Sequence, residues 1–123
     1  MKTLIIPKTE DTPEVRLNPA DNIFKISHRS LPENAIEFYM PVFNWFEDYL
    51  KKPNSQTHFD FELEYFNTST AKQIAKLLIF FERLKDKSEV VIRWHYDKDD
   101  PDMLASGARY AKLINVDFEF IPH

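Results

Sequence analysis

The sequence predicts an α/β fold in which helices cover mainly one face of a mixed β-sheet. Its 123 residues are enough for one domain spanning residues 1–123. From residue 30 onwards, stretches with helical spacing of apolar residues alternate with stretches of period two, which is typical of parallel neighbouring strands. These strands nevertheless alternate polar and apolar residues, which strands covered on both faces do not. We therefore expect an open sheet face that carries Lys25, Glu62, Glu64, Arg93, His95, Asp97 and Glu119.

The composition of the chain excludes several classes of function. A hydrophobic content of 43% with eleven Phe requires a sizeable core. The only glycine is Gly107. Glycine-rich phosphate loops and nucleophile elbows therefore cannot be built, because each needs several glycines. A net charge of −4 argues against nucleic-acid binding, which needs a basic surface.

The sequence also indicates a cytoplasmic protein. The chain has no cysteine, which removes disulfides, thiol nucleophiles and thiolate metal sites and suits a reducing compartment. No apolar run approaches ~20 residues, so no membrane insertion is expected. The apolar run at the N-terminus is too short for a signal peptide.

Three short strands are expected first, over residues 4–6, 14–17 and 22–27. The first is an apolar run stopped by Pro7, and the other two alternate polar and apolar residues. Turn-forming residues separate them, so we expect the strands to be joined as hairpins.

The first helix is expected from Pro32 to Leu50. Ser30 and Glu33 have the spacing of a capping box, with Ser30 as the cap and Glu33 at the third helical position. Pro41 lies inside the apolar pattern and predicts a kink or an irregular first turn. The capping box leaves Asn34 without an assigned part.

A strand over residues 58–66 and a helix from Thr68 to about Lys85 follow. Period two places Tyr65 on the buried face of this strand and Phe66 on the polar face. A ring there would suit a partner contact, or a neighbouring loop would cover it. The junction Asn67-Thr68-Ser69-Thr70 can cap the helix. Its hydroxyls are also candidate phosphate acceptors, because the positive end of a helix dipole stabilises a phosphate.

The last elements are a strand over residues 90–96, a helix beginning near residue 100 and a strand over residues 117–121. The acidic run from Asp97 to Asp102 has two interpretations. Clustered carboxylates bind hard cations. Alternatively, Asp100 caps the helix, Pro101 takes its first position and Asp102 compensates its dipole.

Two His-Asp pairs, His58 with Asp60 and His95 with Asp97, each lie on one strand face. Together they would form a metal site or an acid–base pair, or else an ordinary mixed surface. The enzymatic alternative is therefore a small metal-dependent enzyme that uses His95, Asp97, Asp99 and Asp100. If these residues form only an ordinary mixed surface, the chain is expected to have no catalytic residue, no metal site and no cofactor.

Four segments in this order resemble the SiaC family of bacterial regulatory phosphoproteins: Ser30–Ala35, Phe38–Pro41, Glu64–Lys72 and Trp94–Asp100. The resemblance spans nearly the whole chain. It implies a fold similar to the STAS domain of anti-sigma-factor antagonists. It also implies a protein without enzymatic activity that works as a switch. The chain departs from the family pattern at His28, where glycine is expected, and at Thr70, where serine is frequent.

The resemblance further implies that a serine/threonine kinase phosphorylates Thr68 and that a metal-dependent protein phosphatase reverses the reaction. The unphosphorylated form would bind a diguanylate cyclase and promote cyclic-di-GMP synthesis, which controls biofilm formation and aggregation. An alternative is a partner switch of the anti-sigma-factor-antagonist type with another output. The expected partner surface consists of Glu33, Asn34, Phe66, Asn67, Thr68, Ser69 and Thr70.

Overall fold

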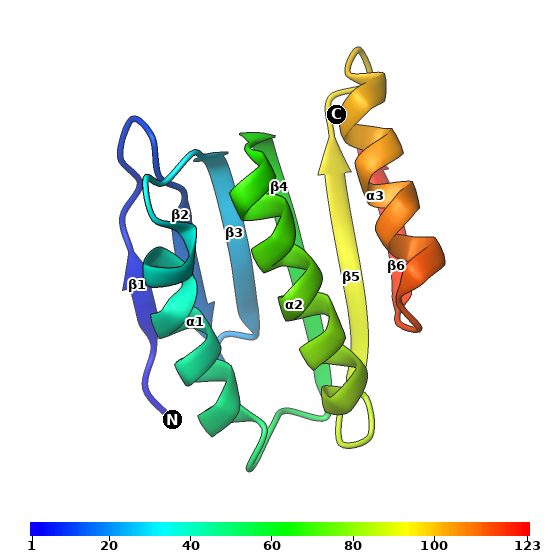
Figure 1. The fold of residues 1–123 in the computed structure, drawn as a ribbon. Coiled ribbons are helices and arrows are strands. Elements are labelled where there is room, and N and C mark those ends of the chain that lie inside the picture. The colour runs from blue at the N-terminus through cyan, green and yellow to red at the C-terminus, as the bar shows by residue number, and fades with distance from the viewer.

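A computed structural model describes all residues from Met1 to His123 and shows a six-stranded sheet under three helices. The strands lie in sequence order, with the first three antiparallel and β3 to β6 parallel. Figure 1 shows the three helices on one face of this sheet. No helix is long and apolar enough to cross a membrane. The elements are β1 (Leu4–Ile6), β2 (Glu14–Asn18), β3 (Ile23–Ser30), α1 (Ala35–Tyr49), β4 (Gln56–Phe66), α2 (Thr68–Leu84), β5 (Glu89–Tyr96), α3 (Pro101–Leu113) and β6 (Asp117–Pro122).

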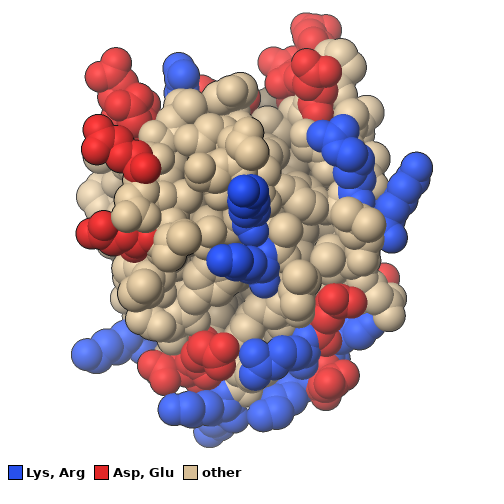
Figure 2. All heavy atoms as spheres, viewed as in Figure 1, with Lys and Arg blue, Asp and Glu red and all other residues tan.

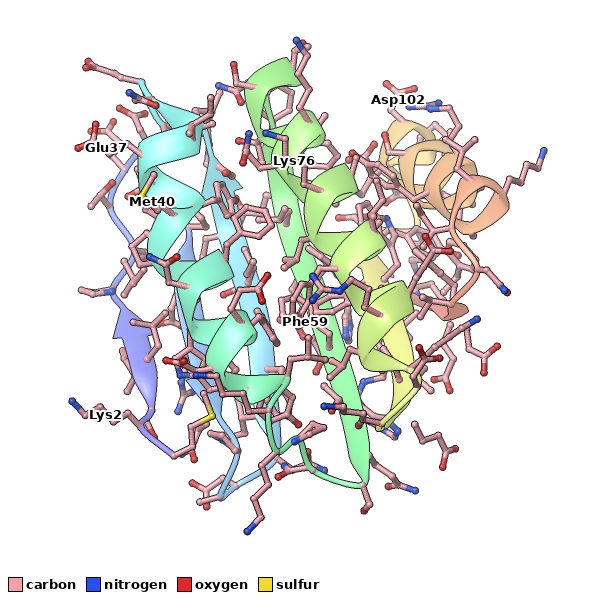
Figure 3. All side chains as sticks on the ribbon, turned by 60° about the horizontal axis from the view of Figure 1, so that its bottom comes forward. Lys2, Glu37, Met40, Phe59, Lys76 and Asp102 are labelled. Carbon is pink, nitrogen blue, oxygen red and sulfur yellow. The ribbon has the colours of Figure 1, made fainter.

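The core lies between the sheet and the helix layer and is rich in aromatic rings. The rings of Phe46 and Phe81 meet edge to face at 5.1 Å, and Phe59 packs 5.0 Å from Phe81. Phe59 lies between the strands and the helices in Figure 3. The opposite face carries ion pairs such as Lys25–Glu62 at 2.9 Å. The predicted mixed sheet with helices on one face is therefore confirmed, and so are the two hairpins that join β1, β2 and β3.

The predicted start of the first helix is wrong. Helix α1 begins at Ala35, and its cap is Asn34, whose side chain accepts a hydrogen bond from the Glu37 N–H at 3.1 Å. Ser30 belongs to β3, where it pairs with Phe66 and is fully buried. The strand continues past the predicted end because its parallel partner β4 also continues. Helix α1 then runs through Pro41 to Tyr49 as one segment.

A register shift near the ends of β3 and β4 explains a second difference. His28 pairs with Leu63 and Arg29 pairs with Tyr65, so that Glu64 has no partner. His28 has φ 78°, in the left-handed region that glycine adopts most easily. This is the position where the family resemblance implies a glycine, so the chain keeps a conformation that glycine favours although it has histidine.

The shift reverses the faces of the last two residues of β4. Tyr65 was expected to be buried, but its side chain is 53% exposed. Phe66 packs against the core instead, with its ring edge-on to Trp94 at 6.2 Å. A bulge adds one residue to a strand and thereby inverts the alternation beyond it. Phe66 is therefore covered, but by the core and not by the neighbouring loop that was the alternative to a partner contact.

Candidate functional site

The parallel strands β3, β4 and β5 end at one edge of the sheet, and all three helices begin there, at the top of Figure 1. Each helix starts with an Asx cap. The side chains of Asn34, Asn67 and Asp100 accept hydrogen bonds from backbone N–H groups at 3.1, 2.9 and 3.1 Å. The fold therefore collects three positive helix ends along one edge.

The start of α2 presents two hydroxyls to solvent. Asn67 is the cap, and the next two residues, Thr68 and Ser69, are exposed. The backbone N–H groups of the first helical turn have no partner within the helix. A negative group attached to either hydroxyl would therefore lie close to unpaired donors and to the positive end of the helix dipole.

The third hydroxyl of this junction, on Thr70, has a different environment. Thr70 is fully buried, and its hydroxyl lies 2.9 Å from Ser30 Oγ and donates to the Ser30 carbonyl at 3.1 Å. Ser30 Oγ in turn shares a hydrogen bond of 2.8 Å with the hydroxyl of Tyr39 on α1. The Asn67 N–H also donates to the Ser30 carbonyl, at 3.2 Å. Thr70 thus ties the start of α2 to β3 and α1 and is not part of the surface.

Tyr39 is neutral in this network. Burial raises the pKa of its hydroxyl to about 12, against smaller opposing effects of the hydrogen bonds with Ser30 and Thr70. A neutral phenol can donate and accept, so the three hydroxyls of Ser30, Tyr39 and Thr70 satisfy one another without charge.

The charge pattern distinguishes α2 from the other two helices. The first turn of α1 contains Glu37 and that of α3 contains Asp102, whereas the first turn of α2 contains no acidic residue. Figure 2 shows acidic side chains on both sides of the upper edge and basic side chains between them. Lys76 projects from α2 in Figure 3. The positive end of α2 therefore lacks the local carboxylate that the other helices have.

A shallow hollow of about 300 Å³ lies between the starts of α1 and α2. It brings together three residues of the expected partner surface, Glu33, Asn34 and Ser69, with Lys72 of α2 beside them. Glu33 precedes the helix, and its side chain is exposed. The hollow therefore joins the two segments that were expected to form one surface.

Two apolar side chains of α1 were not predicted to be exposed, and one of them, Ile36, lines this hollow. Ile36 and Met40 lie one turn apart on α1, and they are 60% and 52% exposed. In Figure 3 Met40 projects from α1 away from the sheet. The sequence contained a signal for them, because the apolar stripe of this helix is wider than one face can bury.

Neither His-Asp pair of the sequence forms in the structure, where His95 pairs with Asp60 instead. His95 Nε2 lies 2.7 Å from Asp60 Oδ1, and Arg93 donates to both oxygens of Asp60 at 2.8 and 2.7 Å. The hydrogen bond with Asp60 raises the pKa of Arg93. Asp60 is therefore held in an ion pair on the open sheet face, and His58 is not in contact with it through any hydrogen bond or ion pair.

The acidic run acts as caps. Asp97 accepts a hydrogen bond from the Asp99 N–H at 2.8 Å, and Asp100 caps α3. No group of three or more His, Asp or Glu side chains is arranged to hold a metal ion. The residues of the enzymatic alternative, His95, Asp97, Asp99 and Asp100, are therefore not assembled into one centre.

Comparisons with known proteins give one consistent result. The model of the SiaC family, described as regulatory phosphoproteins, matches residues 6–123. An uncharacterized protein of Pseudomonas aeruginosa is 31% identical over 99 residues, which is 80% of this chain and 79% of that protein.

The fold is similar to solved structures from the same organism. Apo-SiaC of Pseudomonas aeruginosa matches with a TM-score of 0.89 and 26% identity, over 98% of this chain and 99% of that one. SiaC in complex with the diguanylate cyclase SiaD, of which it is the activator, matches with a TM-score of 0.90 and 26% identity over the same shares. Since the family match covers nearly all of the sequence and the fold agrees, this chain belongs to the SiaC family of regulatory phosphoproteins.

Proposed function

We propose that this chain, acting as one domain over residues 1–123, is a non-enzymatic signalling switch whose phosphate acceptor is Thr68. The observation that carries the proposal is the pair of exposed hydroxyls of Thr68 and Ser69 at the start of α2, the one helix without an acidic residue in its first turn. The resemblance to the family selects Thr68 of the two. A phosphate there would supply the missing negative charge and meet unpaired N–H groups. The modified protein would therefore keep its fold.

The unmodified form binds and promotes a diguanylate cyclase in this proposal. The solved complex of the relative SiaC with the cyclase SiaD supports this choice of partner. The binding surface consists of the hollow with Glu33, Asn34 and Ser69 and of the exposed Ile36 and Met40. A surface that combines exposed apolar side chains with polar ones suits a protein partner.

Phosphorylation then changes what the partner meets. A phosphate adds about −1.5 to −2 of charge and three strong acceptors. Thr68 directly precedes Ser69 in the hollow, so this charge would lie beside the partner surface and would have to be desolvated on binding. A serine/threonine kinase would set the switch, and a metal-dependent protein phosphatase would reset it.

Incubation with the cognate kinase and ATP tests the acceptor. Peptide mass spectrometry should place one phosphate on Thr68, and Thr68→Ala should remove it. Ser69→Ala is the matched control, because it removes the neighbouring exposed hydroxyl and should leave phosphorylation intact. Full modification of Thr68→Ala would show that another residue is the acceptor.

Partner binding is tested separately. The variant Thr68→Ala should bind the cyclase like the unmodified protein, and Thr68→Asp should bind it less tightly. A pull-down with Thr68→Ala as bait, analysed by mass spectrometry, distinguishes a cyclase from a regulator of sigma factors. Equal affinity of the two variants for the captured partner would contradict the switch mechanism.

A further inference from the structure

A second hollow lies on the other side of the same edge, beside the open face of the sheet. It measures about 570 Å³ and shares no lining residue with the hollow between α1 and α2. Only two of its twelve lining residues are hydrophobic, Leu63 and Met103. Its acidic lining residues are Glu14, Glu62, Glu64, Asp97, Asp99 and Asp100, and its only Lys is Lys25.

We call this second hollow the acidic groove. Its one Lys is already paired with a carboxylate of the chain. Lys25 forms an ion pair with one oxygen of Glu62 at 2.9 Å, while the other oxygen lies 3.5 Å from His95. The carboxylates of Glu14 and Glu64 have no ion-pair partner in the chain. The acidic groove therefore has an excess of negative charge that the chain itself does not compensate.

Ser27 gives a second and independent observation. Its side chain lines the acidic groove and is 4% exposed, and its hydroxyl has no hydrogen-bond partner. It is the only buried side-chain polar atom of the chain in this state. In the sheet, Ser27 pairs with Glu14 on β2 and Glu62 on β4, so it lies between two acidic residues. A buried hydroxyl without a partner is costly, and it calls for an explanation such as a missing ligand.

The residues that line the acidic groove indicate which class of ligand it can bind. No three carboxylate or imidazole groups are arranged for a metal ion, and the small apolar lining does not suit a hydrophobic ligand. A guanidinium group carries several N–H donors in a planar fork, which matches carboxylates and can also reach a hydroxyl oxygen. The same sheet face already holds Arg93 on Asp60 through two hydrogen bonds of this kind.

We propose that the acidic groove binds an arginine side chain of a partner protein. Glu14 and Glu64 hold the guanidinium charge. The Ser27 hydroxyl oxygen accepts a hydrogen bond from a guanidinium N–H and thereby gains the partner that the chain does not supply. This interaction surface is separate from the start of α2 and does not depend on the phosphorylation of Thr68.

A labelled hexa-arginine peptide serves as the probe, with its affinity measured by fluorescence anisotropy and its location by backbone amide NMR shifts. The shifts should centre on Ser27, His28 and Glu64. The double variant Glu14→Gln, Glu64→Gln should weaken binding about tenfold or more, since charge-assisted hydrogen bonds are lost. The charge-matched double variant Glu10→Gln, Glu89→Gln alters exposed residues outside the groove and should change the affinity by less than about twofold. An equal loss in both double variants would reduce the interaction to general electrostatics and overturn the proposal.

Two further measurements test the details. A hexa-lysine peptide should bind several-fold more weakly, and equal affinity would overturn the assignment to arginine. Ser27→Ala should weaken hexa-arginine binding while raising the melting temperature by about 4 °C, because the unpartnered hydroxyl is removed. A lower affinity together with a higher melting temperature is expected when a hydroxyl has a hydrogen-bond partner only in the bound state. Unchanged affinity or a lower melting temperature in Ser27→Ala would contradict its role.

Discussion

The starts of α2 and α3 lie at the same edge of the sheet and follow the same plan, but they offer a partner opposite charges. Each helix follows a parallel strand and begins with an Asx cap, Asn67 in one case and Asp100 in the other. After the cap, α2 continues with the exposed hydroxyls of Thr68 and Ser69, whereas α3 continues with Pro101 and Asp102. The cap alone therefore does not decide the role of a helix start, because the two residues after it determine whether the dipole is already compensated.

The two helix starts also differ in how they are anchored. The start of α2 is held by hydroxyl groups, through Thr70, Ser30 and Tyr39. The start of α3 is held by aromatic packing, because Trp94 donates to the Met103 carbonyl at 3.0 Å and contacts the helix at Gly107. A hydrogen bond also connects the two helices, because the Tyr110 hydroxyl of α3 donates to the Ala71 carbonyl of α2 at 2.7 Å. Substitutions in each anchor can therefore test the comparison.

The largest effect is expected in the anchor of α3. A Cβ at Gly107 would lie 2.6 Å from Trp94 Cδ1 and Nε1, so Gly107→Ala must displace the indole or the helix. We expect a loss of about 3 kcal/mol in the free energy of unfolding, although alanine is intrinsically the better helix former. Urea unfolding followed by circular dichroism measures it. The control Ala105→Gly, at an exposed position of α3, should cost only about 1 kcal/mol. A neutral or stabilising Gly107→Ala would show that α3 is not held by this contact.

The anchor of α2 should be sensitive to alkaline pH. Burial raises the pKa of Tyr39 from 10.0 to about 12, so the folded state holds this proton more tightly than the unfolded state. The stabilisation is complete below pH 10 and is lost as the pH rises to about 12, by between about 2 and 3 kcal/mol. Urea unfolding between pH 8 and 12 measures the profile, and Tyr39→Phe should flatten it.

Tyr110 supplies the matching test on α3. Burial also raises its pKa to about 12, and the charge of Arg109 opposes the shift. Its ring is only partly buried, so Tyr110→Phe should flatten the profile less than Tyr39→Phe. The reverse order would mean that the hydroxyl network behind α2 does not dominate the alkaline transition.

A smaller effect separates the buried from the exposed hydroxyls of α2. Thr70→Val keeps the shape of the side chain but removes the hydrogen bonds with Ser30, so the free energy of unfolding should fall by about 2 kcal/mol. Thr68→Val, at the exposed position, should change it by less than about 0.5 kcal/mol. Equal losses in urea unfolding would place both hydroxyls in the same structural role.

The smallest effect concerns the caps themselves. Asn67→Asp adds a carboxylate to the helix start that has no acidic residue and should stabilise the protein by about 0.5 kcal/mol at low salt. Asp100→Asn should cost less than this, because Asp102 still compensates the dipole of α3. Thermal melts at low and high salt measure both changes. A destabilising Asn67→Asp at low salt would contradict the uncompensated charge of α2.

Much of the fold was predictable from the spacing of apolar residues. The order of the six strands and three helices, the position of α2 and the cap of α3 at Asp100 all follow from local patterns, and the structure confirms them. Local patterns failed where two segments meet. Ser30 and Glu33 have the spacing of a capping box, but pairing with β4 holds Ser30 in a strand, and Asn34 becomes the cap.

The candidate site was predictable to a similar extent. Thr68 and Ser69 lie at an exposed helix start, and Glu33 and Asn34 share a hollow with Ser69. Thr70 and Phe66 turn into the core instead. The direction of Phe66 depends on the bulge between β3 and β4, which inverts the alternation after Leu63 and which period two cannot reveal. The direction of Thr70 depends on its hydrogen bonds with Ser30 of the distant strand β3.

The sequence by itself determined the class of the fold, the family and the choice of hydroxyl-bearing residues at the start of α2. The spacing of apolar residues decides the class of the fold, and the four resembling segments point to the family, because each of these signals depends on residues that are close together in the chain. Only the tertiary structure decided which hydroxyls are exposed and which lie in the network of Ser30, Tyr39 and Thr70, which joins residues up to 40 positions apart. The tertiary structure also placed the hydroxyl of Ser27, without a partner, in the acidic groove. Burial and hydrogen bonding arise from the packing of distant segments, and local patterns in the sequence do not specify that packing.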